Sequence, residues 1–431
     1  MIIVGKAVET FTVQTPLFCP YYNIWGRVEY WRDAAFRENP FTVYASSTSG
    51  SPVIIDARGR FFGFMDAERI EGSEFAFDGQ QGLTVTVPEG QRLFVGEEDC
   101  GDDCWRTYNR VVMHELSYPD PADYPLHWKA LEYCTWVEQK FQRAEGASPF
   151  TVLGDTFIRS YIDKVNELGY PRGKLTIDHG WTTGHHTYGD WEIHPERFPD
   201  FAGTIAMIRD AGFTPGLWMA PVWVHPESNI ARRHPDWIGP TIAPSNPDSP
   251  VQKDAWHYFK PLPEVRDHLQ TVFRRFYDMG VRKFKLDMTY YRKDYMLQLH
   301  RLFYQAFKEI DPDIEVEIHQ GDIFFARYGD AIRTNDVLCN AGYRWRELAQ
   351  AHFEVCTKSA PHKVINLDHI GGNDEQVAEP DFLEHLSLYE GRPGYPVVSL
   401  LPHHVGDRAV EQLGTYLDRY VANGEAVSRF C

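Results

Sequence analysis

Two aspartates each follow a run of residues that is typical of a β-strand. Asp287 comes directly after Val281–Leu286, where residue types alternate with a period near two, and Asp336 comes directly after Ala331–Asn335. In parallel α/β folds the chemistry takes place at the carboxyl ends of strands. Two carboxylates that meet there can face each other across a scissile bond, one as nucleophile and the other as acid and base. One aspartate alone is more simply explained as the cap of the next helix, so the prediction depends on the pair.

Other polar side chains lie at or just beyond the ends of apolar β-like runs. They are Asp178, His179, Lys285, His319, Gln320, Arg333, Asp368 and His369. Scattered surface charges would not all fall at such places, so we predict a polar cup at one end of the fold. Carboxylates, amides and cations bind paired hydroxyl groups, and indole rings pack on C–H faces, so the cup suits a sugar ring. Retaining glycosidases hold their two carboxyls about 5–5.5 Å apart, and we expect that separation for Asp287 and Asp336.

Alternating strands and helices are expected to position these residues. Eight strand candidates follow one another at regular spacing: Leu131–Trp136, Lys174–Ile177, Pro215–Met219, Val281–Leu286, Ile314–Ile318, Ala331–Asn335, Lys363–Leu367 and Val397–Leu401. Helical runs separate them, among them Pro263–Met279, which Gly280 is expected to end. Eight such units predict an α/β fold of the (β/α)8 or TIM barrel type, because a doubly wound sheet needs fewer.

The first 125 residues have a different pattern. Short β-like runs such as Phe41–Tyr44 and Leu83–Val87 alternate with turn signals, which predicts an all-β, sandwich-like module. A proline-rich joint, Tyr118–Pro125, follows it. We therefore predict an N-terminal β domain over residues 1–125 and a catalytic barrel over residues 126–431.

An acidic stretch inside the predicted β domain, Gly96–Trp105, contains Cys100 and Cys104. A CxxxC pair alone is weak evidence for zinc, so we interpret the stretch as a solvated loop with Trp105 as a plug over the neighbouring domain. The chain has seven cysteines, an odd and mostly scattered set, which fits reduced thiols better than a disulfide framework.

Charge and composition disfavour several classes of partner. The formal net charge of −18 disfavours nucleic acid and anionic membranes, and no apolar run approaches the roughly 20 residues that span a bilayer. The start of the chain lacks a signal-peptide pattern, so a cytoplasmic location is predicted. There is no glycine-rich phosphate loop, and the adjacent histidines His185-His186 and His403-His404 do not share a face, so we expect no cofactor and no metal. Association into a homo-oligomer is left open.

Several segments, taken in order, resemble the α-galactosidases and raffinose-synthase-like proteins of glycoside hydrolase family 36, in the clan that also holds family 27. The segments are Tyr133-Cys134-Thr135-Trp136, Ile177-Asp178-His179-Gly180-Trp181, Gly189-Asp190-Trp191, Gly216-Leu217-Trp218, His234-Pro235-Asp236-Trp237, Lys285-Leu286-Asp287-Met288 and Arg333-Thr334-Asn335-Asp336. Each is weak alone, but the ordered set is specific. The resemblance implies that Asp287 is the nucleophile and Asp336 the acid/base. The chain ends soon after the eighth strand, so we expect the C-terminal β domain common in that family to be missing.

The resemblance also implies which residues hold the sugar: Asp178, His179, Trp181, Trp191, Trp218, Lys285, His319, Gln320 and Arg333. Three positions depart from the family pattern. His179 replaces the second of two acids that bind O4 and O6 of galactose, His319-Gln320 begins the segment that replaces a Cys-Ser-Ser-Gly-Gly-Gly run, and Ala220 replaces an acid. The α-glycoside chemistry is therefore better supported than galactose as the sugar.

The leading hypothesis is a retaining α-glycoside hydrolase, α-galactosidase-like, that acts on a small carbohydrate or glycoside. An α-transglycosidase, a carbohydrate-binding protein with an inactive barrel site and a metal-dependent hydrolase are the alternatives. Retention of both carboxylates argues against the inactive protein, and the spacing of the histidine pairs argues against the metal enzyme.

Overall fold

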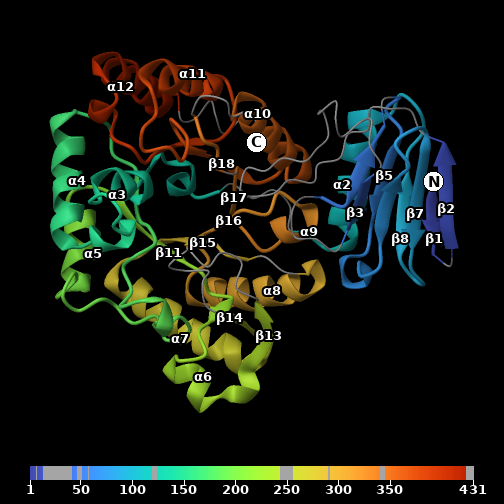
Figure 1. Ribbon diagram of the computed structural model, residues 1–431, viewed down its shortest axis with the longest axis horizontal. Coiled ribbons are helices and arrows are strands. Elements are labelled where there is room, and N and C mark those ends of the chain that lie inside the picture. The colour runs from blue at the N-terminus through green and yellow to red at the C-terminus, as the bar shows by residue number, and fades with distance from the viewer. Residues whose placement is uncertain are drawn as a thin grey trace.

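The centre of the molecule is a closed barrel of parallel strands (Figure 1). The computed structural model describes residues 1–5, 7–12, 41–45, 51–56, 58–118, 124–242, 256–289, 292–334, 336–339 and 345–423. The barrel strands are β9 (Glu132–Cys134), β10 (Lys174–Ile177), β11 (Thr214–Met219), β15 (Lys283–Leu286), β16 (Glu315–Ile318), β17 (Ala331–Arg333), β18 (Val364–His369) and β19 (Tyr395–Val398). Each falls within or beside one of the predicted strands, and the barrel prediction is confirmed.

Helices cover the outside of the barrel, so its strands are buried on both faces. These helices are α3 (Trp136–Gln142), α4 (Asp155–Glu167), α5 (Phe201–Asp210), α7 (Pro263–Met279), α8 (Lys293–Ile310), α10 (Trp345–Ser359), α11 (Glu379–Tyr389) and α12 (Asp407–Ala422). Gly280 ends α7 with φ of 118°, a left-handed conformation that suits glycine. The ring of Phe284 on β15 packs outward on Phe273 of α7 and Phe307 of α8. No helix within the described ranges is long and apolar enough to cross a membrane.

Two excursions interrupt the barrel. After β11 the chain forms a small antiparallel sheet of β12 (Trp223–Val224), β14 (Trp256–Phe259) and β13 (Ile238–Ile242), with the short helix α6 (Asn229–Arg233). After β16 it forms the short helix α9 (Ile323–Ala326). Sequence patterns did not predict the small sheet, because its strands are short and its partners are far apart in the chain.

The N-terminal region forms two four-stranded antiparallel sheets beside the barrel, drawn in blue in Figure 1. Their orders are β1-β8-β5-β4 and β2-β7-β6-β3, with bounds β1 (Ile2–Val4), β2 (Ala7–Thr12), β3 (Phe41–Tyr44), β4 (Val53–Ile55), β5 (Phe61–Phe64), β6 (Glu74–Phe77), β7 (Gly82–Val87) and β8 (Arg92–Val95). Side chains of β7 alternate between buried and half-buried, as expected of a strand with one face on a core. The core between these sheets includes Ala351 and Val355 of α10, so the sheets pack directly on the barrel. Most of the predicted joint lies outside the described residues.

The predicted acidic loop at Gly96–Trp105 is wrong, because helix α2 (Gly101–Glu115) begins inside it. Two aspartates in the first turn complement the helix dipole. Trp105, Tyr108 and Val112 form a buried stripe at helical spacing. Trp105 lies in one apolar cluster with Phe324 of α9, so it does plug the junction with the barrel.

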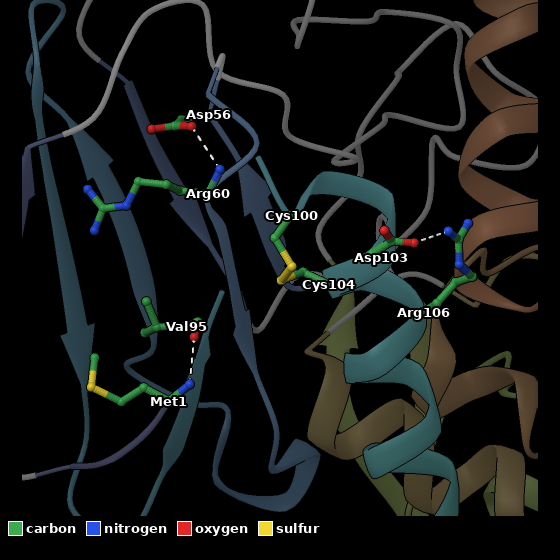
Figure 2. Close-up of a disulfide and its surroundings, with 8 residues drawn as sticks. All are labelled: Met1, Asp56, Arg60, Val95, Cys100, Asp103, Cys104 and Arg106. Carbon is green, nitrogen blue, oxygen red and sulfur yellow. Dashed lines mark hydrogen bonds and ion pairs between the residues drawn. A yellow bond between two sulfur atoms is a disulfide. The ribbon is translucent and has the colours of Figure 1, made fainter. Parts of the chain in front are cut away.

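The expectation of reduced thiols is also wrong for Cys100 and Cys104, which form a disulfide (Figure 2). The start of α2 brings their Cα atoms to 5.2 Å, within the range that a disulfide requires. No sequence signal marked this helix start, since the acidic residues are equally typical of a loop. Cys134, Cys339 and Cys356 are buried and keep reduced thiols, as expected.

Five charged side chains fill the lower interior of the barrel. Lys283 of β15 pairs with Glu132 of β9 across the barrel and lies 2.6 Å from Glu317 of β16. Lys174 of β10 lies 2.9 Å from Glu315, also of β16. All five are essentially inaccessible to solvent. Buried charges need partners of opposite sign with hydrogen bonds, so this layer fixes the strands relative to one another.

We predict that Lys283→Met lowers the free energy of unfolding by about 3–5 kcal/mol, because Glu132 and Glu317 would then be buried charges without their cation. The matched control is Lys164→Met, which breaks the exposed pair with Glu167 and should change stability by no more than about 0.5 kcal/mol. Denaturant midpoints of the two variants measure the difference. Equal losses of unfolding free energy in the two variants would show that the buried charges stabilise the fold no more than an exposed ion pair does.

Candidate active site

The predicted carboxylate pair meets at the carboxyl end of the barrel, on either side of one guanidinium. Nη2 of Arg333, at the end of β17, lies 3.8 Å from Oδ1 of Asp287, and its Nη1 lies 3.1 Å from Oδ1 of Asp336. The two acids are 18% and 32% exposed, whereas Arg333 is 5% exposed. Both carboxylates can therefore be reached from solvent, with the cation behind them.

Donors surround Asp287. The indole of Trp218, on β11, donates to its Oδ2 at 3.1 Å, and the backbone N–H of Met288 donates to its Oδ1 at 2.8 Å. Burial would raise the pKa of Asp287, but the charges of Arg333 and Lys285 and these donors hold it far below its ordinary value. The carboxylate is thus ionised at any working pH, as a nucleophile must be.

A chain of polar contacts reaches Asp287 from the next strand. The side-chain amide of Gln320 donates to Oγ1 of Thr289, which lies 2.9 Å from Nε2 of His319, and we assign the Thr289 hydroxyl as the donor to Nε2. The other ring nitrogen of His319, Nδ1, then carries the proton and lies 3.2 Å from Oδ1 of Asp287. Burial lowers the pKa of His319 to about 4, so the ring is neutral and this tautomer holds. The predicted site residues His319 and Gln320 therefore support the carboxylate.

A second ion pair lies beside the first. Nζ of Lys285, on β15, lies 2.9 Å from Oδ2 of Asp178, which follows β10. Asp178 also accepts from the thiol of Cys134 at 3.2 Å and from the N–H of His179 at 2.8 Å. These contacts fix Asp178 and Lys285 at the barrel mouth, where the sequence predicted them.

An aromatic layer adjoins this ion pair. The imidazole of His179 stacks on the indole of Trp218 with ring centres 4.0 Å apart, and it contacts the hydroxyl of Tyr188. Burial lowers the pKa of His179 well below its ordinary value, so the ring is neutral. The predicted residues Trp181 and Trp191 stack on each other in the core and are fully buried.

Asp336 has fewer donors than Asp287. Besides Arg333, the side-chain amide of Asn373 donates to its Oδ2 at 3.1 Å. Burial acts to raise the pKa of Asp336, and the nearby charges of Arg333 and Lys285 outweigh it, so the pKa lies below its ordinary value. Sequence reasoning missed Asn373 and Thr289. Thr289 directly follows the motif Lys285–Met288, whereas no sequence signal marks Asn373, which reaches the site through the loop after β18.

Asp336, Asp368 and His369 form the one group of metal-ligand geometry in the part of the chain that the structure describes, with one ligand atom from each within 4.8 Å of the others. Arg333 Nη1 lies 3.1 Å from Asp336 and 3.6 Å from Asp368. This permanent cation would repel a metal ion at the same carboxylates, so we interpret the group as an acidic cluster neutralised by arginine.

Residues 153–294 match the family model described as Melibiase. The predicted resemblance to glycoside hydrolase family 36 is confirmed. The matched region holds Asp178, Trp218, Lys285 and Asp287 and ends before Asp336.

The α-galactosidase Mel36A of Lactobacillus acidophilus is 31% identical over 87 residues, which cover 19% of this chain and 12% of that protein. The A type blood alpha-D-galactosamine galactosaminidase of Flavonifractor plautii is 26% identical over 198 residues, covering 42% of this chain and 17% of that protein.

The aligned part of the chain thus spans less than a fifth of the length of these two relatives. Among solved structures, TtGalA, an α-galactosidase from Thermus thermophilus in complex with p-nitrophenyl α-D-galactopyranoside, superposes with a TM-score of 0.61. The match has 17% identity and covers 85% of this chain and 76% of that chain. At this identity the likeness concerns the fold.

We predict that Thr289→Val lowers kcat/KM about 10- to 100-fold on any glycoside that the protein cleaves. Without the hydroxyl, Nε2 of His319 loses its donor and the ring can turn a lone pair toward Asp287. The loss of one hydrogen bond to a charged group is worth about 1.5–3 kcal/mol, which gives this range. Thr289→Ser, which keeps the hydroxyl, is the control and should stay near wild type. Wild-type kinetics in Thr289→Val would show that the contacts through Thr289 and His319 do not orient Asp287.

Proposed function

We propose that the chain is a retaining α-glycoside hydrolase, α-galactosidase-like, that acts through a covalent glycosyl-enzyme intermediate. The observation that carries this proposal is the placement of Asp287 and Asp336 on either side of Arg333, both reachable from solvent. The confirmed family resemblance supports it, because the melibiase match includes Asp287.

The two acids have the different surroundings that a retaining mechanism needs. Asp287 is held ionised by three nearby donors and attacks the anomeric carbon. Asp336 protonates the leaving oxygen and later takes a proton from the attacking water. Arg333 offsets the negative charge of both acids and holds them in position.

The ion pair of Lys285 with Asp178 and the indole of Trp218 form the part of the site that we assign to the sugar hydroxyls and ring. The two relatives described above are named for α-galactosides and for α-D-galactosamine. In this chain the ring of His179 takes one of the expected acid positions. It is neutral, and one of its nitrogens already contacts Tyr188 and His185, so it cannot accept paired hydrogen bonds as a carboxylate does. We therefore propose that the preferred substrate is a substituted or different α-glycoside.

We predict that Asp336→Ala loses about 10²- to 10⁴-fold in kcat/KM on a glycoside with a poor leaving group, because that group needs a proton. Aryl glycosides with good leaving groups should still form the intermediate, and azide should restore turnover by attacking it. Asp287→Ala is the control: without azide it should be inactive on both kinds of substrate, and any azide product that it forms from an activated aryl glycoside should have inverted configuration, whereas Asp336→Ala should give the glycosyl azide with retained configuration. Equal losses for Asp336→Ala on all leaving groups, without azide rescue, would remove Asp336 from the acid/base role.

We predict that aryl α-galactoside is a weaker substrate than aryl α-glucoside or α-N-acetylgalactosaminide when the three are assayed side by side. His179→Asp, which replaces the imidazole with a carboxylate, should raise the activity on α-galactoside relative to the other two. Phe150 lies beside the same ring, and Phe150→Leu is a control that changes packing without adding an acceptor. A galactoside preference of a hundredfold or more, about 2.7 kcal/mol, in the wild-type protein would refute the prediction.

A further inference from the structure

Asp368, at the end of β18, is a third carboxyl group beside the catalytic pair. Its side chain is only 6% exposed, and Nη1 of Arg333 lies 3.6 Å from its Oδ2. Neither of its oxygens has a hydrogen-bond partner among the described residues. Asp368 also adopts φ of 66°, a left-handed conformation that costs free energy for a residue other than glycine. A buried carboxylate held in this way without donors is unfavourable in its ionised form.

The charges around Arg333 do not balance if every acid is ionised. Lys283 shares its charge between Glu132 and Glu317, Lys285 pairs with Asp178 at 2.9 Å, and Glu317 also lies 3.5 Å from Nε of Arg333. Three further acids, Asp287, Asp336 and Asp368, then depend mainly on the single charge of Arg333. One proton among them relieves this excess of negative charge.

The contacts indicate where that proton resides. Asp287 accepts from Trp218 and Met288, and Asp336 accepts from Asn373 and Arg333. Both acids are thus stabilised as anions, whereas Asp368 lacks donors. Once protonated, Asp368 has an O–H group to donate, and an oxygen of Asp336 lies within 4.8 Å of it. The least costly arrangement is a protonated Asp368 facing an ionised Asp336.

We propose that Asp368 is a positioning residue that stores the proton of the acid/base and shares it with Asp336. The proposal rests on the proposed function of Asp336. When the glycosidic bond breaks, the proton of Asp368 passes to Asp336 and from Asp336 to the leaving oxygen, and Asp368 becomes a carboxylate. When water attacks the intermediate, its proton passes to Asp336 and restores the proton of Asp368. Over one cycle a water molecule is consumed and the pair returns to its starting state.

Asp368 is surrounded by a small set of charged and titratable groups. They are Asp336 and Arg333 from β17 and its loop, Lys285 from β15, His369 next in sequence, and Tyr389 of α11, whose hydroxyl donates to the backbone carbonyl of Asp368. Burial and the Asp336 charge raise the pKa of Asp368 well above its ordinary value, against the effect of Arg333 and Lys285. Burial keeps His369 neutral by lowering its pKa, so it does not compete for the proton at neutral pH.

The test is Asp368→Asn, which keeps the shape of the side chain, and asparagine tolerates the left-handed backbone. Without a neighbouring carboxyl group, Asp336 beside Arg333 should ionise at lower pH. We expect the alkaline limb of the kcat/KM profile to move down by at least one pH unit. At neutral pH the loss should be at least tenfold on a glycoside with a poor leaving group and small on an activated aryl glycoside. Asp368→Glu should recover part of the wild-type profile, and Asp330→Asn, which alters another buried carboxylate of the barrel, should leave the limb in place.

A second readout does not need activity. The infrared spectrum of the wild-type protein at neutral pH should contain a carboxylic acid C=O band that Asp368→Asn removes and Asp330→Asn keeps. If the protein cleaves no α-glycoside, the proposed function fails, and the loss of this band still supports the shared proton. If the alkaline limb and the band are both unchanged in a folded Asp368→Asn protein, or if all leaving groups lose activity equally, the proposal is wrong.

Discussion

The contact on which the rest of the structure depends is the ion pair between Lys283 and Glu132 across the barrel, with Glu317 as a third member. A parallel barrel is usually filled by branched apolar side chains. Here the interior holds charges, and each must meet its partner or leave a buried charge uncompensated. This requirement fixes how strands β9, β15 and β16 lie relative to one another. It also sets how far along the barrel axis the polar side chains that follow these strands lie.

The same layer continues directly into the site. Glu317, which shares Lys283 with Glu132, lies 3.5 Å from Nε of Arg333 and so links the guanidinium to the charged layer. From above, Arg333 faces three carboxyl groups and has one charge to offer them. Because a single cation cannot stabilise three anions equally, their donors decide their states. Asp287 has several donors, while the side chain of Asp368 has none among the described residues. In the mechanism that we propose, this difference leaves Asp287 ionised and Asp368 protonated beside the same arginine.

The residues that depart from the family pattern act in different ways. His319 and Gln320 hold the nucleophile through Thr289, which is a supporting role that their positions in the sequence did not predict. The imidazole of His179 stacks on the indole of Trp218. An imidazole in place of an acid therefore changes the hydrogen-bonding groups on the surface that we assign to the sugar. The departures therefore affect both the surroundings of Asp287 and the aromatic layer beside Asp178. The N-terminal sheets are joined to the barrel by apolar contacts of α2 and α10, far from these residues.

The sequence by itself determined the barrel and the place of the catalytic aspartates. Strand periodicity, helix-ending glycines and the order of the motifs are local features, so all of the barrel strands could be located from them. Asp287 and Asp336 follow such strands, and strand ends of a parallel barrel converge whatever the details. Other features depend on partners that are distant in the chain. Examples are the start of α2, the disulfide at that start, the small sheet after β11, and the roles of Thr289, Asn373 and Asp368. A side chain's protonation and its hydrogen-bond partners follow from burial and from charges on other strands, and only the tertiary structure brings those together.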